Sequence, residues 1–76
     1  MKKHILNAII ESAKIAAITN AKEMFITEYD NEYHFCDLKT LNFIMNEMKL
    51  NVKVIANVYL PEHTIPCIEN VKVFKF

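Results

Sequence analysis

The sequence predicts an α+β fold in the order α-β-β-α-β-β, in which a four-stranded antiparallel sheet carries two helices packed on one face. Two observations support this class. Apolar residues recur at helical or strand-like spacing along the chain, at residues 4–19, 24–36, 38–49, 52–59 and 71–76. The chain has 76 residues, which is too short for a second core, so we expect one domain spanning residues 1–76.

Residues 4–19 form the first predicted helix. At about 100° per residue, one stripe of apolar side chains should face the core. It consists of Ile5, Leu6, Ile9, Ile10, Ala13, Ala16 and Ala17. The alanines would let the helix lie close to a sheet. Ile15 and Ile18 fall outside this stripe, on a flank that burial in the core does not require.

A hairpin is predicted for residues 24–36, because two strand-like runs flank Asp30 and Asn31, which suit a two-residue type I′ turn. A loop of this length fixes the register, so two sets of side chains lie on opposite faces. The more apolar set is expected against the helices and consists of Met24, Ile26, Tyr33 and Phe35.

The second predicted helix covers residues 38–49, with Asp37 as its N-cap. Its expected core-facing stripe consists of Leu38, Leu41, Ile44, Met45 and Met48. Phe43 and Leu50 point away from this stripe.

Residues 52–59 and 71–76 complete the predicted sheet, on either side of a loop bounded by Pro61 and Pro66. Small aliphatic side chains are expected to point inward from these strands: Val52, Val54, Ala56, Val58, Val71 and Val73. The open face would then collect Lys53, Ile55, Tyr59, Lys72, Phe74 and Phe76.

The absence of glycine and arginine excludes several functions. Glycine-dependent phosphate loops, dinucleotide fingerprints and nucleophile elbows cannot form, and no arginine fork can read a base or clamp a phosphate. The net charge is zero, which disfavours binding to duplex nucleic acid. Without glycine, asparagine is the best residue for left-handed backbone, and we expect that role for Asn20, Asn31 and Asn51.

Four side chains form the best candidate for metal or thiol chemistry: His34, Cys36, His63 and Cys67. Their residue types suit tetrahedral zinc, but their spacing matches none of the strong zinc signatures. Two buried thiols and two surface histidines are the ordinary alternative. Cys36 beside His34 also lacks an identifiable oxyanion donor, so we expect no enzyme activity, no metal and no cofactor.

The start of the chain carries lysines before an apolar run, as signal peptides do, but polar residues interrupt that run. No stretch approaches the roughly 18 apolar residues of a membrane span. We therefore expect a cytoplasmic protein with reduced thiols and no membrane contact.

Apolar residues exceed what one small core can absorb, which predicts a protein-binding domain. The expected partner surface combines spare apolar residues with an acidic hairpin: Ile15, Ile18, Glu28, Asp30, Glu32, Phe43 and Leu50. Size and AT-rich composition suggest a phage or mobile-element accessory protein that inhibits a host defence machine by steric occlusion.

Two alternatives remain open. The open sheet face could stack single-stranded nucleic acid on Tyr59, Phe74 and Phe76 beside Lys53 and Lys72. The same apolar surplus would also suit a homodimer or a larger homo-oligomer with a structural role.

Overall fold

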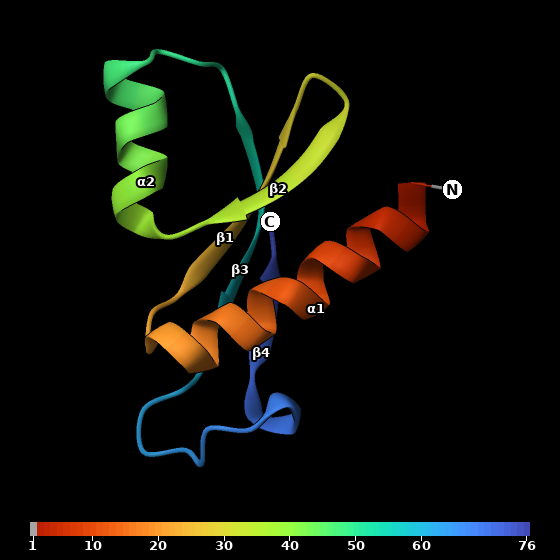
Figure 1. Ribbon diagram of the computed structural model, residues 1–76, viewed down its shortest axis with the longest axis vertical. Helices are drawn as coiled ribbons and strands as arrows, with labels where there is room; N and C mark the ends of the chain where they lie inside the picture. Colours follow the sequence, from red (N-terminus) through yellow and green to blue (C-terminus); the bar gives the residue numbers. More distant parts are fainter. Residues whose placement is uncertain (1) are drawn as a thin grey trace.

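A helix and a twisted four-stranded sheet form the two layers of the protein, as the computed structural model of residues 2–76 shows (Figure 1). The elements in chain order are α1 (Lys2–Asn20), β1 (Met24–Tyr29), β2 (Glu32–Cys36), α2 (Leu38–Asn42), the π-helix η1 (Phe43–Glu47), β3 (Lys53–Tyr59), the short 3-10 helix η2 (Ile68–Asn70) and β4 (Lys72–Lys75). The predicted α+β class, the element order and the antiparallel sheet are confirmed.

The hairpin has the predicted turn and register. Asp30 and Asn31 both adopt positive φ, 52° and 64°, as a type I′ turn requires. Tyr29 pairs with Glu32, which sets the antiparallel register of β1 and β2. The sheet order is β2-β1-β3-β4, so β1 and β3 are central and β4 is an edge strand.

The core lies between α1 and the central strands. From α1 it contains Ile10, Ala13 and Ala17, and from the rest of the chain Met24, Ile26, Ala56, Val58 and Val71. Ala13 is fully buried, because a methyl side chain lets the helix approach the sheet closely. Ile26 and Val58 are fully buried beneath it, and each contributes roughly 1.5–3 kcal/mol of hydrophobic stabilisation.

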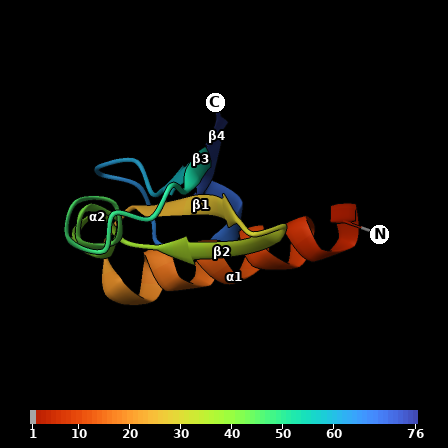
Figure 2. The same cartoon turned by 90° about the horizontal axis from the view of Figure 1, so that it is seen from above.

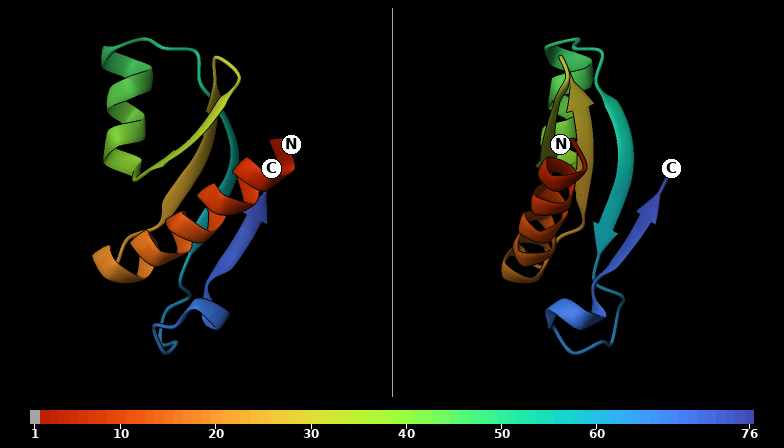
Figure 3. Two further views of the ribbon diagram at one scale, coloured as in Figure 1. Left: turned by 45° about the vertical axis from the view of Figure 1, so that its right-hand side comes forward. Right: turned by 90° about the vertical axis from the view of Figure 1, so that its right-hand side faces the viewer.

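Two expectations for α1 are wrong. Ile5, expected in the core, is exposed, whereas Ile18, expected on a free flank, packs against the core. The reason is the diagonal path of α1, whose N-terminal turns extend past the strands while its last turns lie over them (Figures 1 and 3).

A β-bulge changes the faces of β3. Ile26 pairs with Ala56 but the next residue, Thr27, pairs with Val54, so Ile55 is the extra residue. Beyond the bulge the alternation is inverted. Ile55 packs against the core, and Lys53 pairs with Glu28 on the helix side of the sheet. Both residues were expected on the open face.

The two helices contribute unequally to the fold. α1 contacts β1, β2 and β3, whereas α2 contacts β1. In Figure 2, α1 lies below the sheet and α2 lies beside it, level with β1 and β2. Most of α2 and η1 is therefore not covered by the sheet or by α1.

Both helical segments end in left-handed backbone without glycine or asparagine. Ala21, with φ of 51°, follows α1, and Lys49, with φ of 56°, follows η1. Ala21 closes a Schellman motif, because its amide donates to Ile18 and the Lys22 amide donates to Ala17, at 3.4 and 3.2 Å. Of the three expected asparagines, Asn31 alone has positive φ; Asn20 is the last residue of α1, and Asn51 follows a turn made by Lys49.

Candidate protein-binding surface

α2 begins immediately after β2 because Asp37 caps it, as predicted. The Asp37 carboxylate accepts a hydrogen bond from the amide of Thr40 at 2.8 Å. This bond, together with the Lys22 ammonium 3.6 Å from the carboxylate, holds the pKa of Asp37 below its usual value. The charged form of Asp37 therefore stabilises the first turn of α2.

The helix predicted for residues 38–49 changes its winding halfway. After α2 it continues as η1, where the amide of Met48 donates to the carbonyl of Phe43, five residues earlier, at 3.1 Å. The amide of Leu50 then donates to the carbonyl of Ile44, also at 3.1 Å. A π-helix turns less per residue than an α-helix, so side chains after Phe43 move away from the predicted stripe.

Four large apolar side chains of this segment are exposed, and we call them the α2–η1 surface: Leu38, Phe43, Met45 and Met48. Each exposes between 43% and 55% of its area. Within the segment, Leu41 is buried and Ile44 is half-buried, so these two residues attach it to the rest of the protein. The exposure of Phe43 was predicted, whereas Leu38, Met45 and Met48 were expected in the core.

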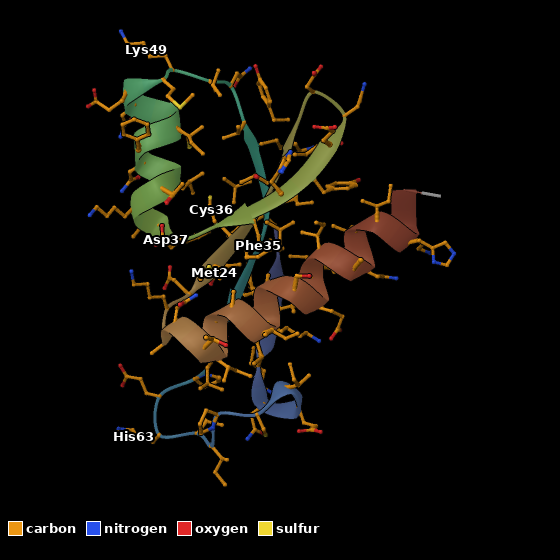
Figure 4. All side chains as sticks on the ribbon, viewed as in Figure 1. Met24, Phe35, Cys36, Asp37, Lys49 and His63 are labelled. Atoms are coloured by element: carbon orange, nitrogen blue, oxygen red, sulfur yellow. The ribbon has the colours of Figure 1, made fainter. Side chains whose placement is uncertain are left out.

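An open pocket of about 560 Å³ adjoins the α2–η1 surface. It lies between the end of α1 and the start of α2, and its lining consists of Lys22, Glu23, Asp37, Leu38, Lys39 and Asn42. Figure 4 shows Asp37 at this junction, between the two helices. The pocket places charged groups of both signs next to the exposed Leu38 side chain.

The other apolar residues of the expected partner surface do not join Phe43. Ile15 is exposed, but on α1, in another layer of the molecule (Figures 1 and 2). Ile18 is half-buried and packs against the core, and Leu50 is half-buried just after the left-handed Lys49. Of the four apolar residues expected on the partner surface, Phe43 is therefore the one that lies on the α2–η1 surface.

The acidic residues of the hairpin lie on different faces. Glu28 pairs with Tyr33 and Lys53 on the helix side, and Glu32 lies on the open side. Asp30 is at the turn. The Glu32 carboxylate is 3.5 Å from the His34 imidazole, and both side chains are well exposed. The three carboxylates thus surround the tip of the hairpin instead of forming one flat acidic patch.

The open sheet face holds the second apolar group of the molecule. Tyr59 pairs with Lys72, and the rings of Phe74 and Phe76 pack edge to face with centroids 5.5 Å apart. Lys53 is absent from this face because of the bulge. One of the two lysines expected beside these rings is therefore missing, which weakens the nucleic-acid alternative.

The four candidate zinc ligands are not brought together. Among residues 2–76, no three His, Cys, Asp or Glu side chains are arranged to hold a metal ion. Cys36 lies at the end of β2, and His63 lies in the loop at the far end of the molecule (Figure 4). Burial, and then the nearby Asp37 carboxylate, raise the pKa of the Cys36 thiol, so the reactive thiolate is disfavoured.

Comparison with known protein families, curated proteins and solved structures finds no match for this chain. Within residues 2–76, no helix combines the length and the hydropathy that a bilayer crossing requires.

Proposed function

We propose that this protein is a non-catalytic protein-binding domain that docks on its partner through the α2–η1 surface. The exposure of four large apolar side chains on one short helical segment carries this proposal. Apolar side chains gathered on a small domain are typical of interfaces, because their removal from water stabilises a complex.

The composition of the α2–η1 surface suits a protein partner. Phe43 offers a rigid aromatic side chain of the kind that anchors interfaces. Met45 and Met48 are flexible and polarisable, so they adapt to an apolar groove. Lys39, Glu47 and Lys49 are exposed on the same segment and supply a charged rim that orients the partner.

The proposed consequence of binding is steric occlusion. The small size of the domain and its AT-rich composition support an accessory protein of a phage or mobile element that covers a functional surface of a host protein. The hairpin tip, with Asp30 and Glu32 exposed, would steer a basic region of that partner by long-range attraction.

Quantitative affinity capture from host cells tests this proposal. A partner should be enriched by the wild-type protein, and the purified partner should bind the Phe43→Ser, Met48→Ser double variant at least about tenfold more weakly. The matched control is Ile5→Ser with Ile15→Ser, which removes two exposed apolar side chains from α1. Equal binding by wild type and both double variants would exclude the α2–η1 surface.

A further inference from the structure

We propose that the outer edge of β4 pairs with the β4 edge of a second copy of this chain. The two strands would run antiparallel with Phe74 opposite Phe74, a register about Phe74, and the two sheets would join into one sheet of eight strands. The β4 edge is a surface separate from α2–η1. β4 has β3 on one side and no other strand of the described sheet on the other. In Figure 3, right, β4 lies at the outer side of the sheet, away from α1.

The backbone of β4 determines which groups face outward. The amide of Phe76 donates to the carbonyl of Ile55 in β3 at 3.0 Å. Because donors alternate in an antiparallel strand, the amides of Phe74 and Lys72 also face β3. The amides and carbonyls of Val73 and Lys75 therefore face the outer edge, where a second strand would bond to them.

These outward groups select one register. When Phe74 lies opposite Phe74 of the second copy, Val73 of each chain lies opposite Lys75 of the other, and both residues bond through their outward amides and carbonyls. A register about Val73 would instead need the outward amide of Val71, which already donates to the carbonyl of Ile68 at 3.2 Å. The register about Phe74 uses two unoccupied donors in each chain.

The side chains suit the same register. Phe74 would face its own copy in a non-hydrogen-bonded pair, where side chains are closest. Lys72 would lie opposite Phe76 of the second copy, in reach of a cation–π contact. Lysines on an edge strand normally oppose strand pairing, but here no lysine directly faces another lysine.

The interface would be small and reversible. Phe74 and Phe76 expose 59% and 69% of their area. If a phenylalanine residue has an accessible area of about 200 Å², these two residues from both chains together offer roughly 500 Å² of exposed aromatic surface to the dimer interface. Standard interfaces bury about 1,600 Å², so we expect a dissociation constant on the order of 10–100 µM.

Analytical ultracentrifugation from about 5 to about 500 µM, which spans that affinity, tests the proposal. The mean mass should rise from one chain towards two. Lys75→Pro should weaken the dimer at least about tenfold, because proline removes an outward amide but no bond to β3. Lys75→Ala keeps that amide and is the matched control. Thermal melting under dilute conditions shows whether each monomer folds as the wild type does.

Amide hydrogen exchange gives a second measurement at the edge itself. The amides of Val73 and Lys75 should become protected as concentration rises, whereas the amide of Phe74, which faces β3, should be protected throughout. A mass that stays at one chain, or a dimer unaffected by Lys75→Pro in a normally melting monomer, would overturn the proposal. The Phe43→Ser, Met48→Ser variant should still dimerise, so failure here is distinct from failure of the proposed function.

Discussion

The two helical segments share an amphipathic pattern but have different surroundings. α1 places Ile10, Ala13 and Ala17 against three strands of the sheet. The segment α2–η1 has about half its length but buries one residue, Leu41, and half-buries Ile44. A helical stripe thus predicts a helix, but it does not tell what covers that stripe.

If the proposed function is correct, the two helical segments have different roles, one in stability and one in binding. Burial of apolar surface in α1 stabilises the domain, whereas the exposed side chains of α2–η1 are available to stabilise a complex. Segments with few buried contacts open locally at lower free energy than the core. We therefore expect α2–η1 to open more readily than α1.

The largest expected effect comes from shortening a side chain on each helix. Ile10→Ala should lower the free energy of unfolding by about 2–4 kcal/mol, because Ile10 is buried under the sheet and its loss leaves a cavity. Met48→Ala should change it by less than about 0.5 kcal/mol, since Met48 is exposed. Urea unfolding followed by circular dichroism measures both values.

The Ile10 variant has a milder counterpart if it does not fold. Ile10→Val should cost about 0.5–1.5 kcal/mol. Equal losses for Met48→Ala and Ile10→Val would contradict the comparison, because α2–η1 would then be packed as firmly as α1.

Local features of the fold were predictable from the sequence. The Asp30-Asn31 turn fixes its own register through backbone conformations that these two residues tolerate, and Asp37 caps α2 through a bond within four residues. The alternation of side chains along residues 71–76 likewise predicted correctly that Val73 faces the core and that Phe74 lies on the open face of the sheet.

Non-local features were not predictable. The bulge at Ile55 depends on how β3 fits β1, and it inverts the face of Lys53. The π-helical winding of η1 leaves Met45 and Met48 exposed, although both fit an α-helical stripe. Of the candidate site, the sequence therefore identified Phe43 but not the neighbours that make it part of a surface.

An intermediate effect is expected where the helices end. Ala21 and Lys49 both adopt left-handed backbone, which costs about 1–2 kcal/mol for a residue with a Cβ atom. Glycine removes that cost but makes the unfolded chain more flexible, so Ala21→Gly should raise the free energy of unfolding by about 0.5–1 kcal/mol. Lys49→Gly should raise the free energy of global unfolding by less than Ala21→Gly does, because α2–η1 is expected to open before the rest of the domain unfolds.

Native-state hydrogen exchange distinguishes the two glycine variants. Lys49→Gly should slow exchange of amides in α2 and η1, while Ala21→Gly should slow exchange in α1 and in the core that unfolds with it. A Lys49→Gly variant that destabilises the protein would show that the lysine side chain, and not its backbone, matters at this position.

The smallest expected effect is the response of α2 to acid. Because the folded state lowers the pKa of Asp37, the carboxylate adds stability above its unfolded pKa of about 3.9. That contribution is lost as pH falls through the lower, folded pKa. Protection of the α2 amides, measured against their intrinsic exchange rate at each pH, should therefore fall below about pH 4, when the amides of α1 are still protected.

Asp37→Asn separates the charge of this cap from its hydrogen bond. Asparagine keeps a side-chain oxygen for the Thr40 amide, so α2 should still form. The protection of its amides, measured against their intrinsic exchange rate, should then stay constant over the pH range in which Asp37 titrates in the wild type. Added salt should change the stability of α2 little in the wild type, because the ion pair between Asp37 and the exposed Lys22 ammonium contributes little to stability. Simultaneous acid loss of α1 and α2 protection would instead mean that the two helices unfold as one unit, and that the exposed α2–η1 segment is held as firmly as the core.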